Sequence, residues 1–320
     1  MQIVLSFILF IIGFILLILG ANFLVNGASS LAKRLSISGI VIGLTVVAFG
    51  TSTPELIVNI FGSLGGYNEI VYGNIIGSNI FNILVILGIS GLIYPLTVEK
   101  NTVWKEIPFS LLAAILLFIL VNDILILGLK RDELSRIDGL LFIGLFLVFI
   151  YYTFRISKIQ TSDTYEVKTY EIPTTVLYIV GGFILLFIGG KLVIDNTVLL
   201  ASELGVSRKL IALTIIAGGT SLPELATSAV AAFKKRCDIA VGNIIGSNIF
   251  NIFLILGISS IINPASYNPI LNIDLFVLIF CTLFLFITMF TGTVRKLDRW
   301  KALLFIITYF IYIIYLLFRK

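Results

Sequence analysis

The chain has 320 residues, of which 59% are hydrophobic and only 12% are charged, and its formal net charge is +5. This composition lies outside the range of soluble globular domains and is typical of a protein embedded in a lipid bilayer. Histidine is absent, which excludes imidazole as a metal ligand or as a general base near neutral pH. The basic residues cluster at the ends of apolar segments, where the membrane accounts for them, so we expect no nucleic-acid partner.

Ten long apolar segments follow one another along the chain, and most of them are long enough to cross roughly 30 Å of hydrocarbon as helices. They cover residues 3–25, 39–62, 70–93, 107–122, 139–154, 173–200, 208–233, 239–262, 270–291 and 299–318. Their apolar character is continuous, whereas the strands of a membrane β-barrel alternate. The first segment lacks a basic n-region and is too long for a signal peptide. We therefore predict an all-α integral membrane protein with ten transmembrane helices.

The distribution of Lys and Arg predicts how these helices are oriented. The face that carries the loops after odd-numbered segments has fourteen of the 22 basic residues, and the opposite face, which carries both termini, has eight. By the positive-inside rule the first face is cytoplasmic. We expect a multi-pass protein of the cell membrane, with both termini extracellular and the polar loop 156–172 cytoplasmic.

The sequence contains an internal duplication. Shifting it by 169 positions aligns GTSTPEL (50–56) with GTSLPEL (219–225), and GNIIGSNIFNILVILGI (73–89) with GNIIGSNIFNIFLILGI (242–258). This predicts a five-helix repeat over residues 1–155, a cytoplasmic linker over 156–172 and a second five-helix repeat over 173–320. Because five is odd, the second repeat starts from the opposite face of the membrane, and the two repeats should be inverted relative to each other.

Each repeat places one glutamate inside an apolar segment, at Glu55 and at Glu224. A carboxylate there is costly and usually faces a partner or a water-filled cavity, so two at matching positions indicate one shared cation site. The alternative is a protonated glutamate that is hydrogen-bonded between helices. Pro54 and Pro223 each remove an intrahelical donor, which frees a backbone carbonyl oxygen beside the glutamate.

Hydroxyl and amide oxygens accompany each glutamate at helical spacing. They belong to Thr51, Ser52, Ser78 and Asn82 in the first repeat, and to Thr220, Ser221, Ser247 and Asn251 in the second. Asn79 and Asn248 are also candidates for polar contacts between packed helices. An all-oxygen donor set suits Ca²⁺ and Na⁺ and offers no soft ligand for zinc or copper. One Ca²⁺ neutralises two carboxylates and two Na⁺ do the same, so competition for one site is a mechanism of exchange.

At these motifs the sequence resembles the sodium/calcium exchanger branch of the calcium/cation antiporter superfamily, whose repeats have the form GTSxPE and GNxxGSNxxN. The resemblance covers all ten predicted spans. It implies a central Ca²⁺ site made by Glu55, Glu224 and the backbone oxygens of Thr51 and Thr220, which Na⁺ can also occupy. It further implies a Na⁺ site on either side of the centre, one made by Ser52, Ser78 and the carbonyl of Ala48, and the other by Ser221, Ser247 and the carbonyl of Ala217. The amides of Asn82 and Asn251 complete the centre.

The resemblance also implies an activity. It is secondary active antiport of Ca²⁺ against Na⁺, with three Na⁺ per Ca²⁺ and therefore net charge movement, by alternating access in which the first and sixth spans slide. Relatives that depend on K⁺ carry Asp where this chain has Asn251, which argues against K⁺ dependence. We expect no enzymatic activity, no cofactor and no obligatory protein partner, so that a monomer surrounded by lipid suffices.

Three other functions share some of these features. A proton/Ca²⁺ exchanger would use the same carboxylates, because paired acids bind protons readily, but would not need the flanking hydroxyls and amides. An intramembrane protease would need both acids to activate one water, which the GTSxPE context does not resemble. A passive cation channel would show flux without dependence on a counter-ion, whereas inverted repeats favour alternating access.

Overall fold

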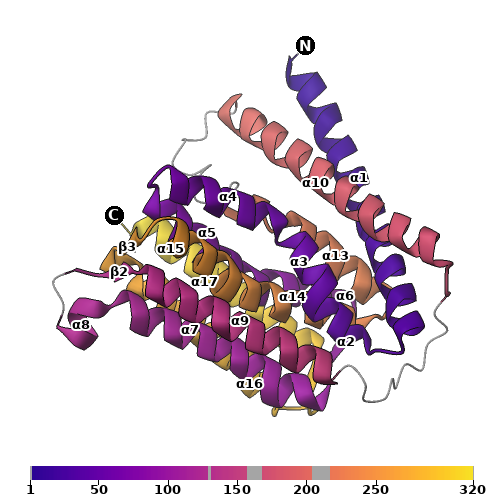
Figure 1. The fold of residues 1–320 in the computed structure, drawn as a ribbon. Coiled ribbons are helices and arrows are strands. Elements are labelled where there is room, and N and C mark those ends of the chain that lie inside the picture. The colour runs from indigo at the N-terminus through magenta and orange to yellow at the C-terminus, as the bar shows by residue number, and fades with distance from the viewer. Residues whose placement is uncertain (1, 129–130, 157–167, 204–216, 320) are drawn as a thin grey trace.

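The computed structural model describes residues 2–128, 131–156, 168–203 and 217–319, and almost all of them are helical (Figure 1). In the first half the elements are α1 (Gln2–Leu35), α2 (Gly39–Ile42), η1 (Gly43–Val47), α3 (Ala48–Thr51), α4 (Thr53–Leu64), α5 (Asn68–Phe81), η2 (Asn82–Ile86), α6 (Leu87–Ile93), β1 (Leu96–Thr97), η3 (Thr102–Glu106), α7 (Ile107–Val121), α8 (Asp123–Leu127), β2 (Glu133–Leu134) and α9 (Arg136–Ile156). In the second half they are α10 (Ile172–Glu203), α12 (Ala217–Gly219), α13 (Leu222–Phe233), α14 (Cys237–Ile249), η5 (Phe250–Leu256), α15 (Gly257–Ile262), β3 (Ala265–Ser266), η6 (Pro269–Leu271), α16 (Asn272–Thr288), β4 (Lys296–Leu297) and α17 (Arg299–Phe318).

Within these residues, eight helices are long and apolar enough to cross a membrane, and a bent pair formed by Gly39–Thr51 and Thr53–Leu64 makes a ninth candidate. The chain is therefore a multi-pass membrane protein. The predicted span 208–233 begins in residues 204–216, outside the described part, and its described portion includes the shorter helix Leu222–Phe233. Ten spans in two inverted repeats thus remain a prediction, as do the sides on which the termini and the loop 156–172 lie, and most of that loop is also outside the described residues.

The same break interrupts both glutamate-bearing helices. The second span bends by 47° between Thr51 and Thr53, and Ser52 lies at the break with φ −81° and ψ 7°. Ser221, in front of α13, adopts nearly the same conformation with φ −86° and ψ 9°. Pro54 and Pro223 occupy the first turn of the helix that follows, where proline is tolerated and cannot continue the preceding helix.

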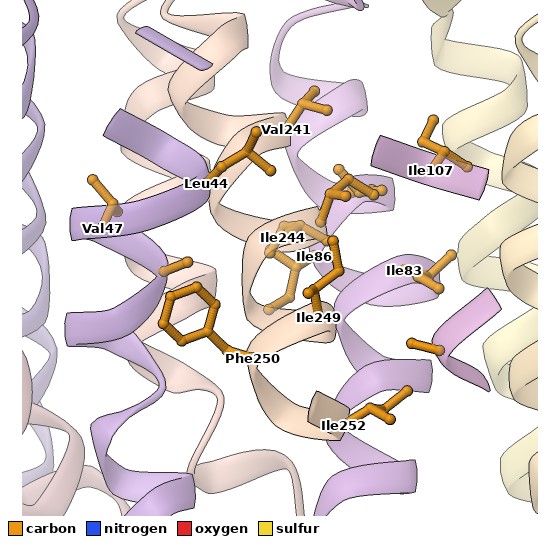
Figure 2. Close-up of a cluster of buried hydrophobic side chains, with 14 of the residues drawn as sticks. Leu44, Val47, Ile83, Ile86, Ile107, Val241, Ile244, Ile249, Phe250 and Ile252 are labelled. Atoms are coloured by element: carbon orange, nitrogen blue, oxygen red, sulfur yellow. The ribbon is translucent and has the colours of Figure 1, made fainter. Parts of the chain in front are cut away.

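The buried core lies around α14 and η5, which are surrounded by η1, η2, α7 and α9. Figure 2 shows aliphatic side chains from these elements, together with Phe250, filling the space between the helices. Close helix approach depends on small residues: a Cβ atom added to Gly242 of α14 would lie 2.8 Å from the carbonyl oxygen of Ile40 and 3.1 Å from the Cα of Gly43. The two halves therefore share one core.

Helices α1 and α10 pair closely with each other and cross on one side of the molecule (Figure 1). Glycines lie where they cross: an added Cβ on Gly20 would come within 2.9 Å of the Gly182 carbonyl oxygen, and one on Gly189 within 2.8 Å of the Gly13 carbonyl oxygen. Such close backbone packing is common between membrane helices. The pair contacts the rest of the described chain chiefly through α13 and α2.

Two short strand pairs connect the halves. β1 of the first half pairs with β4 of the second, and β2 of the first half pairs with β3 of the second, both antiparallel. Each pair joins the loop after the third span of one half to the loop after the fourth span of the other. Loops that the charge distribution assigns to the same face therefore meet in space.

Candidate cation-binding site

The predicted site residues come from four places: the two helix breaks, and the matching stretches of α5–η2 and α14–η5. All ten of the predicted hydroxyl, amide and carboxylate side chains are buried: Thr51, Ser52, Glu55, Ser78, Asn82, Thr220, Ser221, Glu224, Ser247 and Asn251. Ala48 is buried in α3 and Ala217 is the first residue of α12. The bent helices and the motif helices pack on each other, α4 on α5 and α13 on α14.

The two glutamates are held reciprocally by serines of the opposite half. Ser52 donates its hydroxyl hydrogen to Glu224 Oε1 at 3.0 Å. Ser221 donates in the same way to Glu55 Oε1 at 3.1 Å. Each bond joins a serine at one break to the carboxylate beside the other break, so the two carboxyl groups belong to one centre formed by both halves.

Two asparagines that were not among our predicted site residues support the breaks. Asn243 donates to the backbone carbonyl oxygen of Glu224 at 3.4 Å and accepts from the Thr51 hydroxyl at 3.0 Å. Asn74 repeats this arrangement with the carbonyl oxygen of Glu55 at 3.4 Å and the hydroxyl of Thr220 at 3.3 Å. Both follow the first glycine of the repeated GNIIGSN motif, and that duplicated position was the signal that could have identified them.

A second set of amides connects the motif helices across the middle of the site. Asn79 donates to the backbone carbonyl oxygen of Asn248 at 3.2 Å and accepts from Asn251 Nδ2 at 2.8 Å. Asn248 likewise accepts from Asn82 Nδ2 at 3.0 Å. Asn79 and Asn248 therefore make the interhelical contacts considered for them. They also orient the amides of Asn82 and Asn251, which lie in the π-helical segments η2 and η5.

Six buried oxygen atoms of the predicted site have no hydrogen-bond partner among the described residues, and they form three repeat-related pairs. They are the Oε2 atoms of Glu55 and Glu224, the Oγ atoms of Ser78 and Ser247, and the Oδ1 atoms of Asn82 and Asn251. An unsatisfied buried polar atom costs about 1–3 kcal/mol, and native structures contain few of them. A cation at the centre of these oxygens would supply the missing interactions.

The hydroxyls of Thr51 and Thr220 donate their hydrogens to the two asparagines, and the ligands predicted for these residues are their backbone oxygens. The Ala48 carbonyl oxygen already accepts from the backbone nitrogen of Ser52 at 3.0 Å and lies 3.4 Å from the Thr51 hydroxyl. A cation there would have to share it.

Charge balance also favours a cation. Among the ion pairs of the described residues, none involves either glutamate. The described residues also contain no cluster of three or more His, Cys, Asp and Glu side chains that could hold a metal ion. Two buried carboxylates without a basic partner need either protons or a bound cation. Carboxylate, hydroxyl and amide oxygens are ligands for hard cations such as Ca²⁺ and Na⁺.

A cavity lies beside the site, next to α5. It measures about 420 Å³ and extends from Glu69 and Arg319 to Asn74 and Thr220. In the second half, the α14 residues that match this stretch of α5 are covered by residues 40–48. The segment that matches 40–48 by the repeat shift lies almost entirely outside the described residues.

Three comparisons agree with one another. A profile for the sodium/calcium exchanger protein matches residues 5–155 and 174–318. The putative antiporter CaxA of Alkalimonas amylolytica is 36% identical over 91% of this chain and 92% of its own. The sodium/calcium exchanger MaX1 of Methanosarcina acetivorans is 31% identical over 90% of this chain and 91% of its own. A solved structure of the sodium-calcium exchanger NCX_Mj, soaked with Na⁺ and Sr²⁺, superposes with a TM-score of 0.82 at 32% identity, over 97% of this chain and 98% of that one.

Proposed function

Since the chain belongs to the sodium/calcium exchanger family, we propose that it is a secondary active antiporter that exchanges Ca²⁺ for Na⁺ at one site containing Glu55 and Glu224. The family is the one that its repeated motifs resemble, and its named members are transporters, not enzymes. The transported ions Na⁺ and Ca²⁺ are substrates, and no cofactor is part of the proposal.

The set of six unpartnered oxygens carries this proposal. Each half contributes one carboxylate, one hydroxyl and one amide oxygen. Ca²⁺ takes six to eight oxygen ligands, so the carboxylate and amide oxygens together with the backbone carbonyl oxygens of Thr51 and Thr220 are sufficient in number and kind. Two carboxylates balance one Ca²⁺, and two Na⁺ balance the same pair. The two ions therefore compete for the same negative charges.

Two Na⁺ positions on either side of the centre are part of the proposal. One would use Ser52, Ser78 and the carbonyl oxygen of Ala48, and the other Ser221, Ser247 and the carbonyl oxygen of Ala217. The unpartnered hydroxyls of Ser78 and Ser247 support it. With a third Na⁺ at the centre the stoichiometry would be three Na⁺ per Ca²⁺, so that each cycle moves one net positive charge.

Alternating access is part of the proposal. Inverted repeats give a transporter two equivalent pathways to one site, and exchange between their open and closed forms would expose the site to each side of the membrane in turn. The cavity beside Asn74 supports one such pathway. By the positive-inside rule, Glu69 and Arg319 would lie at its extracellular end, with the loop 156–172 in the cytoplasm.

The proposal is tested by reconstituting the purified protein in vesicles and following the uptake of radioactive calcium. Vesicles loaded with Na⁺ should take up Ca²⁺ when external Na⁺ is diluted, and vesicles loaded with K⁺ should not. Charge movement should make the rate depend on the membrane potential. Uptake driven equally well by a proton gradient without Na⁺ would favour a proton/Ca²⁺ exchanger instead.

Glu55→Gln and Glu224→Gln are the matched variants for this assay, because each keeps the shape and the acceptor oxygen of the side chain while removing its charge. Both should abolish Na⁺-driven uptake. Glu69→Gln, at the outer end of the cavity, is the control and should keep most of it. Wild-type uptake in both glutamine variants would place the ion site elsewhere.

A further inference from the structure

A second polar cavity lies away from the proposed ion site, between α1, the segment that leads into α10, and the turn that joins α13 to α14. It measures about 250 Å³, and its lining consists of Asn26, Ser29, Lys168, Tyr170, Lys234 and Arg236. Among these described residues, three side chains are basic and none is acidic. A partly open space beside Lys168 and Lys234 favours an anion, because an anion would reduce the repulsion between their charges.

Lys234 is the most constrained of the three. It is half-buried at the end of α13, and its ammonium group donates to Asn26 Oδ1 at 2.9 Å and to the Asn22 backbone carbonyl oxygen at 3.4 Å. Burial, followed by the nearby charge of Arg236, lowers the pKa of Lys234. An ammonium group has three donors, so one remains after these two bonds. A bound anion would accept it and would offset the cost of burying the charge.

Ser29 supplies an independent observation. Its side chain is only 8% exposed, and its hydroxyl group has no hydrogen-bond partner among the described residues. It lines the same cavity as the three basic groups. A buried hydroxyl without a partner beside basic groups is what a site for an oxyanion provides, since the hydroxyl can donate to one of the anion's oxygens.

The surroundings indicate where the anion comes from. The cavity lies at the end of the membrane-spanning helix α1 that carries Lys33 and Arg34, on the face that the basic residues assign to the cytoplasm. Arg34 donates to the backbone carbonyl oxygen of Tyr170, and the Tyr170 nitrogen donates to Ser30 at 2.9 Å. A pocket at this level of a membrane protein meets lipid headgroups, and basic pockets between membrane helices bind anionic ones.

We propose that this cavity binds the phosphate group of an anionic membrane lipid, held by Lys168, Lys234 and Ser29. Because Lys234 already joins α13 to α1, the bound phosphate fixes α1 and the start of α10 against α13 and α14. The lipid therefore stabilises one position of the helix pair α1 and α10 relative to the rest of the protein. This inference does not depend on which ions are exchanged.

Thermal unfolding of the full-length protein in phosphatidylcholine nanodiscs tests it, with phosphatidylglycerol added at increasing mole fraction. The unfolding midpoint of the wild type should rise and saturate, because a ligand that binds only the folded state stabilises it. In Lys234→Gln and Lys168→Gln, the half-saturating mole fraction should increase about tenfold, the effect of losing one charge-assisted hydrogen bond. Lys168 is exposed, so its variant should fold even if Lys234→Gln does not.

The control is Lys100→Gln, because Lys100 is an exposed basic residue on the same predicted face and outside the cavity. This variant should show the same half-saturating mole fraction of phosphatidylglycerol as the wild type. An equal loss of response in this variant would overturn the proposal in favour of general surface charge. A rise of the same size with inorganic phosphate in pure phosphatidylcholine would overturn the lipid assignment and indicate a soluble phosphate compound. A wild-type midpoint that does not respond to phosphatidylglycerol would overturn the site itself.

Discussion

Alanine at two glycines of the membrane helices should have unequal effects. A Cβ atom on Gly246 of α14 would lie 2.8 Å from both the Ala48 Cβ and the Leu44 carbonyl oxygen, closer than carbon atoms pack. On Gly144 of α9, which is exposed, an added Cβ meets no described atom within 4 Å. Overpacking of a tight interface costs about 1–3 kcal/mol. Gly246→Ala should therefore lower the free energy of unfolding by about that amount, and Gly144→Ala should not lower it.

Thermal unfolding of both variants in the same lipid, without added Ca²⁺, measures this difference. The consequence for exchange follows from alternation. A penalty of about 1–3 kcal/mol on the arrangement in which residues 40–48 cover α14 shifts its population about 5- to 150-fold toward the opposite state. Gly246→Ala should then slow uptake and change the half-saturating Ca²⁺ concentration differently on the two sides of the membrane. Equal unfolding midpoints for the two variants, or a lower one for Gly144→Ala, would refute the reasoning.

Three further outcomes are expected. Ser52→Ala and Ser221→Ala each remove a donor to a buried carboxylate, a bond worth about 1.5–3 kcal/mol, so both should reduce Na⁺-driven uptake by similar factors; an effect of only one would contradict the reciprocal geometry. Glu106 is a buried acid that accepts a hydrogen bond from Tyr152 and has no ion-pair partner among the described residues. Replacing both groups by apolar ones in the double variant Glu106→Leu with Tyr152→Phe should therefore raise the unfolding midpoint. Because the folded state lowers the pKa of Lys234, the unfolded chain holds more protons as pH rises toward 10.5, so stability should increase there in the wild type and not in Lys234→Gln.

The repeated motifs made the position of the site predictable. A duplicated glutamate after a proline-broken helix, with Ser and Asn four residues apart on the next helix, specifies which residue types recur at matching places. The prediction of an exchanger of this family, made from these letters, is confirmed by the comparisons. The roles of individual ligands stay predictions, since the unpartnered oxygens support them without a bound ion.

What the sequence could not provide is the pairing between the halves. That Ser52 reaches Glu224 instead of Glu55 depends on how two distant segments pack, and no local pattern records it. The sequence also led to a prediction of the first helix that was too short. The predicted span ended at residue 25, whereas α1 reaches Leu35. Its last turns include Ser29 and Ser30, which are buried against protein, although a hydropathy pattern reads such residues as the end of a span.

A search at one fixed shift also misses features whose spacing differs between the halves. Glu106 is buried in η3 and accepts a hydrogen bond from Tyr152 at 2.8 Å. In the second half Asp274, one position short of the 169-residue shift, accepts a hydrogen bond from Tyr312 at 2.8 Å. The second carboxylate oxygen of Glu106 has no partner among the described residues. The cavity lined by Lys234 was not predicted from the sequence either, because its residues come from three separate segments.

The crossed strand pairs constrain how such a protein can move. β1 pairs with β4 and β2 pairs with β3, so backbone bonds tie the first half to the second at two separate places. A rigid rotation of one half against the other would have to keep both of these ladders or bend the loops that carry them. The strands follow spans other than α1 and α10, and within the described residues no strand pairing includes that pair. We therefore expect the parts of both halves that carry the strands to stay together as one unit, and any movement between the two exposures of the site to occur between this unit and the pair α1 and α10.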